Sequence, residues 1–149
     1  MVNKMDEGII RLANALDEQG MIGFTRSFVE DIRVGREAVN RELLPWITEI
    51  DRGWAGVLFL GMGGSAAGGD FVSALCDNEG SIPIRCNRNY ELPNWWPPDW
   101  LVVATSYSGN TEETISACEQ AMHQDATIIV VSSGGILSGM CELSETMYL

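Results

Sequence analysis

The fold is decided by residues 101–114, which read Leu101-Val102-Val103-Ala104-Thr105-Ser106-Tyr107-Ser108-Gly109-Asn110-Thr111-Glu112-Glu113-Thr114. The first four residues form an apolar run that is typical of a buried strand. After the hydroxyl-rich turn, apolar residues recur at helical spacing from Ile115 to Met122. We therefore predict a strand, a turn and a helix, in that order.

A turn of this kind places hydrogen-bond donors where an anion can bind. The first backbone N–H groups of a helix have no partner within the helix, and the helix dipole is positive there. The hydroxyls of Ser106, Ser108 and Thr111 add donors that can follow the oxygens of a phosphate group. The alternative is that Asn110 only caps the helix, with Glu113 completing a capping box. Capping does not account for all three hydroxyls, so the pattern favours a phosphate-binding turn.

Strand-like and helix-like patterns alternate along the rest of the chain. The apolar runs that predict strands lie at 57–60, 82–86, 101–104, 127–131 and 146–149. We expect the runs at 57–60 and 127–131 to be buried on both faces. This alternation predicts an α/β fold, a three-layer α/β/α sandwich with a central, mostly parallel sheet of about five strands and a flavodoxin- or Rossmann-type topology.

Two amphipathic helices precede the first strand. The first carries apolar residues from Ile9 to Leu16 and is expected to end near Gly20. The second carries an apolar stripe that includes Phe24, Phe28, Ile32, Val39 and Leu43, and Pro45 should close it. We predict that residues 1–45 pack on a domain formed by residues 46–149, in a single domain overall. A dimer contact is the alternative for these helices.

A proline-rich stretch at 92–100 contains three tryptophans, Trp95, Trp96 and Trp100. The prolines predict a stiff connection without regular secondary structure. We expect the tryptophans to cover the edge of the core, while a lid over a ligand and an interface patch remain alternatives.

The composition restricts the partners. The 149 residues suffice for one domain with a real core, and the net charge of -12 argues against binding to nucleic acid or to anionic membranes. A small phosphorylated ligand is compatible with this charge, because backbone N–H groups can form a local positive site. No apolar run approaches the length of a membrane span and the N-terminus has no apolar signal segment, so we predict a cytoplasmic protein. The four cysteines form no CxxC pair, which predicts reduced core thiols and no metal site.

Three turns rich in glycine and serine follow predicted strands, at 61–65, 106–111 and 132–135. In open α/β sheets, ligands bind outside the carboxyl ends of the strands. The three turns can therefore converge on one crevice.

The first of these turns also satisfies the loose dinucleotide fingerprint, as Gly61-x-Gly63-x-x-Ala66. That fingerprint expects an acidic residue at the end of the second strand, and no acid stands there. Arg88 could instead contact a 2′-phosphate. A dinucleotide-binding domain thus remains as a weaker alternative.

Two motifs carry a family resemblance. Residues 61–70 and 106–114 together resemble the sugar isomerase (SIS) domain, and more narrowly the first SIS domain of the bifunctional phosphoglucose/phosphomannose isomerases. Shorter matches are Tyr90-x-Leu92-Pro93 and Ser132-Ser133-Gly134-Gly135, and the resemblance covers about residues 20 to 149.

The resemblance implies a hexose 6-phosphate ligand, homodimerisation and no organic or metal cofactor. By position, the phosphate contacts fall on Ser106, Ser108 and Thr111, and the sugar-side contacts fall on Gly64 and Ser65. Gly63 and Ser132 complete the set of expected substrate-binding residues. The implied reaction is aldose–ketose isomerisation, in which a glutamate moves a proton between C2 and C1 through a cis-enediol.

Several departures from the family bear on catalysis. The catalytic glutamate, histidine and lysine of the family lie in a second SIS domain, and this chain stops at Leu149. His123 falls late in a helix, and Glu112 and Glu113 would lie beside the phosphate, so none is expected to be catalytic. Ile136 stands where some relatives carry a basic residue. We expect binding without turnover from this chain alone, and a non-catalytic sugar-phosphate sensor is the alternative function.

Overall fold

The computed structural model describes residues 4–39, 45–48, 50, 52–144 and 147–148. The chain divides into two compact units, residues 1–51 and residues 52–149. Each unit is described by itself below. The predicted packing of residues 1–45 on the remainder of the chain stays a prediction.

The N-terminal unit consists of helix α1 (Lys4–Leu16), helix α2 (Met21–Ala38) and a short 3-10 helix (Pro45–Thr48). Both carboxylate oxygens of Asp17 accept backbone hydrogen bonds at the start of α2, from Met21 N at 2.7 Å and from Ile22 N at 2.8 Å. α2 ends at Ala38, earlier than the predicted stop at Pro45. The predicted stripe position at residue 43 lies outside the described residues.

The apolar stripes of these two helices are exposed in the structure. On α2, the side chains of Phe24, Phe28 and Ile32 are each more than half exposed. Apolar side chains repeat at helical spacing on α1 as well, where Leu12 and Leu16 are exposed. The helical periodicity predicted from the sequence is therefore confirmed.

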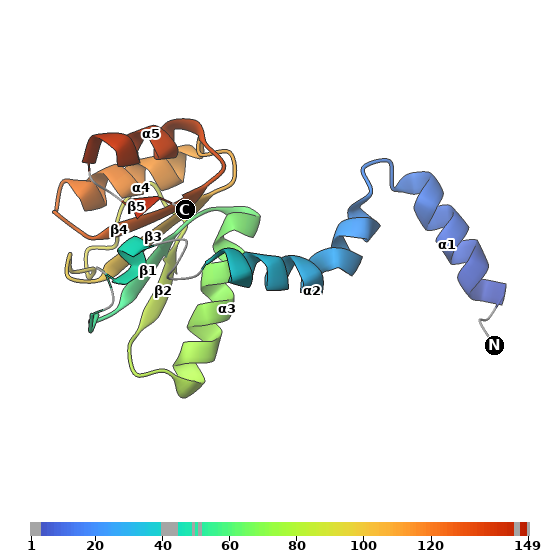
Figure 1. Cartoon of the computed structure of the whole chain (residues 1–149), viewed down its shortest axis with the longest axis horizontal. Coiled ribbons are helices and arrows are strands. Elements are labelled where there is room, and N and C mark those ends of the chain that lie inside the picture. Colours follow the sequence, from blue (N-terminus) through green and yellow to red (C-terminus); the bar gives the residue numbers. More distant parts are fainter. Residues whose placement is uncertain (1–3, 40–44, 49, 51, 145–146, 149) are drawn as a thin grey trace. The chain divides into compact units, whose positions relative to one another are not determined.

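The second unit contains a sheet whose strands are all parallel and are ordered β2-β1-β3-β4-β5 (Figure 1). The strands are β1 (Val57–Leu60), β2 (Ile84–Asn87), β3 (Leu101–Ser106), β4 (Ile128–Ser132) and the two-residue β5 (Met147–Tyr148). This confirms the predicted α/β class and the parallel sheet. The strand order reverses direction between β1 and β3, as in flavodoxin-like sheets.

Three helices cover the sheet, namely α3 (Gly63–Glu79), α4 (Glu112–Met122) and α5 (Gly135–Ser144). α3 lies on one face, while α4 and α5 lie on the other (Figure 1). This arrangement follows from right-handed crossovers, because the chain moves from β1 to β2 in one direction and from β3 to β5 in the other. The three-layer sandwich predicted from the sequence is confirmed.

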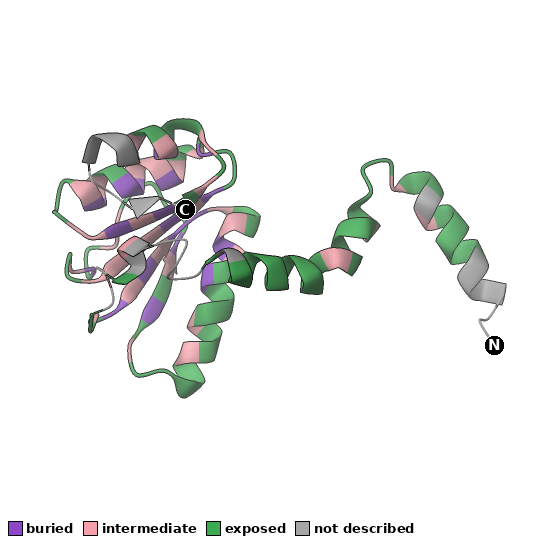
Figure 2. Cartoon of the chain, viewed as in Figure 1, coloured by how far each residue is buried: buried purple, intermediate pink, exposed green. Residues whose placement is uncertain are grey.

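The two faces of the sheet are not equally buried. Leu58, Val102 and Val130 are completely buried in the core that also includes residues of α4 and α5. Figure 2 shows buried segments along the strands. Alternate positions face α3 and are only partly covered, and Val131 is exposed. The expectation that β1 and β4 are buried on both faces was therefore wrong. The physical reason within the second unit is that α3 packs mainly over β2 and less extensively over β1 and β3, so it covers this face only in part.

The connection from β2 to β3 contains no helix. Trp96 is buried in the core and Trp100 packs against it, as expected for residues that cover the core edge. Trp95 differs, since its side chain is 58% exposed.

In the part of the chain that the structure describes, no helix has both the length and the apolar character that a membrane span requires.

Candidate phosphate-binding crevice

Two of the predicted turns meet where the strand order reverses. Leu60 and Ala104 are paired in the ladder between β1 and β3, so the turns that follow these strands begin side by side. A Cβ on Gly61 would lie only 3.0 Å from the carbonyl oxygen of Thr105, so a larger residue would force the backbone of the neighbouring strand to shift. Ligands of open α/β sheets bind in the crevice at such a reversal.

The hydroxyls predicted to hold phosphate lie together. Ser106 ends β3 with its side chain buried, and its Oγ lies 2.8 Å from Oγ1 of Thr111. The same Ser106 Oγ accepts a hydrogen bond from Gly109 N at 3.2 Å. Ser108 is exposed, and its Oγ accepts a hydrogen bond from Asn110 N at 3.2 Å. The turn therefore presents one partly buried hydroxyl pair and one exposed hydroxyl.

The N-terminus of α4 is open. Thr111 is the N-cap residue, and no side chain forms a capping hydrogen bond with the first turn of α4 among the described residues. The alternative that Asn110 caps this helix was wrong, because its side chain bonds elsewhere. The free N–H groups of this turn and the positive end of the helix dipole can therefore receive an anion.

A second open helix start lies at α3. Its N-cap residue is Met62, and no side-chain capping bond is found there in the described part of the chain. Gly63, with φ of 50°, and Gly64 are exposed at this start. Ser65 lines a hollow of about 330 Å³ together with Thr105, Tyr107, Val131, Ser132 and Ser133. The structure thus brings the predicted residues Ser65 and Ser132 to one hollow.

The start of α5, in contrast, is closed by the phosphate turn. Asn110 Oδ1 accepts a hydrogen bond from Ile136 N at 3.1 Å, and the carbonyl oxygen of Gly109 accepts one from Leu137 N at 3.0 Å. Gly109 has φ of 67°, and a Cβ there would lie 1.7 Å from the carbonyl oxygen of Gly134. The two turns therefore interlock, backbone against backbone.

Ser132 contributes to its own turn. Its Oγ donates a hydrogen bond to the Gly134 carbonyl oxygen at 2.8 Å and accepts one from Gly134 N at 3.3 Å. The neighbouring Ser133 Oγ donates to the carbonyl oxygen of Tyr107 at 2.5 Å. The predicted role of Ser132 in substrate binding stays a prediction, and these bonds give its hydroxyl a structural function as well.

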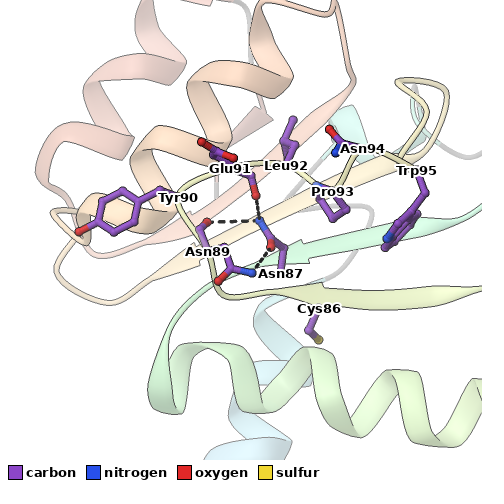
Figure 3. Close-up of a pocket in the computed structure, with 9 residues that line it drawn as sticks. All are labelled: Cys86, Asn87, Asn89, Tyr90, Glu91, Leu92, Pro93, Asn94 and Trp95. Atoms are coloured by element: carbon purple, nitrogen blue, oxygen red, sulfur yellow. Dashed lines mark hydrogen bonds between the residues drawn. The ribbon is translucent and has the colours of Figure 1, made fainter.

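A larger hollow of about 640 Å³ lies at the carboxyl end of β2 (Figure 3). Its lining is the continuous segment from Cys86 to Trp95 without Arg88. No cation lines it, so it lacks the charge that would favour a phosphate dianion. Burial, and then a hydrogen bond with Asp70, raise the pKa of the Cys86 thiol to about 11, so this thiol is protonated at neutral pH.

Two amides hold this loop in place. The Asn87 side chain is buried, and its Nδ2 donates to the carbonyl oxygens of Asn89 at 3.3 Å and Glu91 at 3.1 Å (Figure 3). Gln120 of α4 donates to the carbonyl oxygen of Tyr90 at 2.7 Å and accepts from Leu92 N at 3.2 Å. The loop is therefore fixed to the helix that begins at the phosphate turn.

The remaining candidates lie outside the crevice. His123 is the C-cap residue of α4, which has 11 residues, so it lies about 16 Å along the helix from the phosphate turn. Arg88 forms an ion pair with Asp70 of α3. Cys76, Cys86 and Cys118 are free thiols, as predicted. Within the described residues, no group of three or more His, Cys, Asp or Glu side chains could hold a metal ion.

Comparison with known sequences identifies relatives for part of the chain. It is 43% identical over 86 residues to the bifunctional phosphoglucose/phosphomannose isomerase of Caldicellulosiruptor bescii, which covers 58% of this chain and 25% of the relative. It is 29% identical over 109 residues to the D-glucosamine-6-phosphate 4-epimerase of Sulfolobus acidocaldarius, covering 71% and 32%. The matches thus span about a quarter to a third of these relatives. No family model matches the chain.

Solved structures show the same fold. A protein of Salmonella typhimurium LT2 assigned as a phosphosugar isomerase superposes with a TM-score of 0.56 and 24% identity, covering 69% of this chain and 32% of the other. The Vibrio vulnificus NanR protein, complexed with ManNAc-6P, superposes with a TM-score of 0.58 and 20% identity, covering 88% and 53%. Over 58% of its length the chain is thus homologous to bifunctional phosphoglucose/phosphomannose isomerases, and its α/β unit shares the fold of these two solved structures. Its α/β unit is accordingly called the SIS-like domain.

Three contacts of the SIS-like domain were not expected from the sequence. Asn110 caps α5, Gln120 holds the loop around Tyr90, and the Tyr90 hydroxyl donates a hydrogen bond to Glu112 Oε2 at 3.3 Å. Each contact joins residues that are 22 to 30 positions apart. Local patterns cover only neighbouring residues, so no sequence signal could have identified these partners.

Proposed function

We propose that the SIS-like domain binds the phosphate of a hexose 6-phosphate between β1 and β3, as part of an enzyme that interconverts glucose 6-phosphate or mannose 6-phosphate with fructose 6-phosphate. The observation that carries this proposal is the uncapped start of α4, preceded in the same turn by the Ser106–Thr111 hydroxyl pair and the exposed Ser108 hydroxyl. Homology to bifunctional phosphoglucose/phosphomannose isomerases supports the choice of reaction.

In the proposed complex, the phosphate lies against the first turn of α4. The partly buried Ser106–Thr111 hydroxyl pair and the exposed Ser108 hydroxyl donate to its oxygens, together with backbone N–H groups. The sugar then extends toward Gly63, Gly64 and Ser65 at the start of α3, with Ser132 at the same hollow as Ser65. A phosphate dianion suits this site because the donors of two helix starts supply the positive potential that the acidic chain otherwise lacks.

Isomerisation requires more than binding. The sugar ring must open, and a base must then remove the proton from C2 and deliver it to C1. Near the phosphate turn, the described acids are Glu112 and Glu113, which stand beside the phosphate rather than beside the sugar carbons. We therefore propose that the base comes from outside residues 1–149, either from a longer chain or from another subunit. No metal ion or organic cofactor is needed for this proton transfer.

The relatives support recognition of a sugar 6-phosphate more than recognition of one particular sugar. The epimerase relative is named for D-glucosamine 6-phosphate, and NanR was crystallised with ManNAc-6P. What these ligands share is a hexose that carries a phosphate on C6. The hydroxyl-rich turn recognises that shared group.

A second candidate function is a sugar-phosphate sensor without catalytic activity. The observation that favours it is that Glu112 and Glu113, the described acids at the turn, begin α4 beside the proposed phosphate, so the turn can bind a sugar phosphate without supplying a base. A sensor would use the same phosphate turn and would need no catalytic base. The two functions differ in turnover once the missing base is supplied, so the coupled isomerase assay must include the longer chain or the additional subunit.

The test is calorimetric titration with fructose 6-phosphate, NAD and NADP. Wild type should bind the sugar phosphate, and the Ser106→Ala/Ser108→Ala variant should lose at least about 100-fold in affinity, because two hydrogen bonds to a charged group are removed. Ser81→Ala is the matched control, since Ser81 is exposed at the amino end of β2. Dinucleotide binding that survives the double substitution would instead place a nucleotide at the turn from Gly61 to Ala66.

A further inference from the structure

Two acids stand at the helix start where the phosphate is proposed to bind. Glu112 and Glu113 are the first two residues of α4. Acidic side chains at such positions are attracted to the free N–H groups and to the helix dipole, and they often bend back to satisfy them. A glutamate that did so would occupy the donors that the phosphate needs.

Neither acid caps the helix in the described structure, and Glu112 has a different partner. Its Oε2 accepts a hydrogen bond from the hydroxyl of Tyr90 at 3.3 Å. Tyr90 lies on the loop between β2 and β3, and the same loop lines the hollow of about 640 Å³ (Figure 3). The carboxylate is thus held by a residue from outside the phosphate turn.

The position of Tyr90 is fixed by its backbone. Its carbonyl oxygen accepts the Gln120 Nε2 hydrogen bond at 2.7 Å, and two residues later Leu92 N donates to the same Gln120 side chain. The buried Asn87 amide holds the carbonyl oxygens of residues 89 and 91 on either side of Tyr90. The ring itself is about half exposed, so these contacts, rather than burial, direct the hydroxyl to Glu112.

We propose that Tyr90 is a positioning residue for the phosphate site, whose hydroxyl holds the Glu112 carboxylate away from the open N–H groups of α4. This inference rests on the proposed function. It adds that the Glu112 carboxylate competes with phosphate for the N–H groups of α4, and that the loop carrying Tyr90 prevents this competition. The electrostatics agree with the geometry. The negative charge of Glu113, partial desolvation and Glu112 raise the pKa of Tyr90, as expected for a phenol that faces both acids.

The test is a double-mutant cycle on binding of fructose 6-phosphate. Tyr90→Phe keeps the ring and removes only the hydroxyl, so affinity should fall about five- to tenfold as Glu112 becomes free to compete. Adding Glu112→Gln should restore the affinity, because a neutral amide competes weakly. Glu113→Gln is the matched control, since it removes an equal charge at the same helix start but Glu113 has no hydrogen bond with Tyr90. Within the Glu113→Gln background Tyr90→Phe should still reduce the affinity, whereas within the Glu112→Gln background it should not. A purely structural role of Tyr90 would not respond to Glu112→Gln.

A second measurement needs no ligand. The Cζ chemical shift of Tyr90, titrated with pH, should show a pKa above the ordinary value in wild type and a lower one in Glu112→Gln. An unchanged pKa in that variant, or wild-type affinity in Tyr90→Phe, overturns the inference while the proposed function stands. Failure of wild type to bind either fructose 6-phosphate or inorganic phosphate overturns the proposed function, and the inference with it.

Discussion

The turns after β3 and β4 look alike in sequence and differ in what they leave free. Both are short, rich in glycine and serine, and lead from a parallel strand into a helix. After β3, the start of α4 has no side-chain cap, whereas the start of α5 is capped by Asn110 and by the Gly109 carbonyl oxygen. The turn after β3 therefore supplies the cap of α5. Whether a helix start can receive a ligand depends on the partner that already occupies it, and composition alone does not show this.

Breaking the interlock between these turns should have the largest effect. Gly109→Ala would place a Cβ 1.7 Å from the Gly134 carbonyl oxygen at a φ of 67°. The clash and the backbone strain together should cost at least about 3 kcal/mol in the free energy of unfolding, measured by thermal or urea denaturation. Gly68→Ala is the control, since nothing lies within 4 Å of its added Cβ and alanine favours helix. Equal stability of the two variants would mean that the turns do not interlock.

Single serine substitutions test the difference between the uncapped start of α4 and the capped start of α5. Ser106→Ala should reduce affinity for fructose 6-phosphate by about 10- to 100-fold, because the lost hydroxyl contacts a charged group. Ser132→Ala should reduce it by about threefold, since the Ser132 hydroxyl already bonds within its own turn. Calorimetry measures both. A larger loss of affinity in Ser132→Ala than in Ser106→Ala would indicate that the phosphate binds at the turn after β4.

The smallest expected effects come from Asn110, which joins the two turns. Asn110→Ala and Asn110→Asp should each cost about 1 kcal/mol in stability, because both lose the bond from Nδ2 to the Ser108 carbonyl oxygen. The aspartate keeps an acceptor for Ile136 N but brings a negative charge to the phosphate turn. Its affinity for the sugar phosphate should therefore be several-fold below that of the alanine variant. Equal affinities of the two variants would argue against a bound anion at this turn.

Much of the fold could be predicted from the sequence. The order of strands and helices, the parallel sheet and the position of the turns at the carboxyl ends all follow from apolar runs and turn residues, which are local features. The burial of the sheet could not be predicted in the same way. Val131 belongs to an apolar run, yet it is exposed within the second unit, where α3 packs mainly over β2. Coverage of a face depends on where a distant helix packs.

In the candidate site, too, the features that depend on neighbouring residues were predictable and those that depend on distant contacts were not. Ser106, Ser108 and Thr111 lie within six residues of one another, and the sequence alone identified them as a cluster. The alternative in which Asn110 caps the next helix was wrong, since its Oδ1 accepts a hydrogen bond from Ile136 N, 26 residues away. Nothing in the residues near Glu112 indicated that Tyr90 would be its hydrogen-bond donor. Contacts across the carboxyl edge of the sheet are set by the tertiary fold.

The two uncapped helix starts have a thermodynamic consequence for the empty domain. α3 and α4 begin after neighbouring strands, so two partial positive charges and two sets of unsatisfied donors stand near each other. In the absence of an anion, this arrangement opposes folding. A bound phosphate would reverse the sign of that contribution, and a ligand at 100 times its Kd adds about 2.7 kcal/mol to the stability of the native state. The melting temperature of the SIS-like domain should thus report the concentration of its ligand.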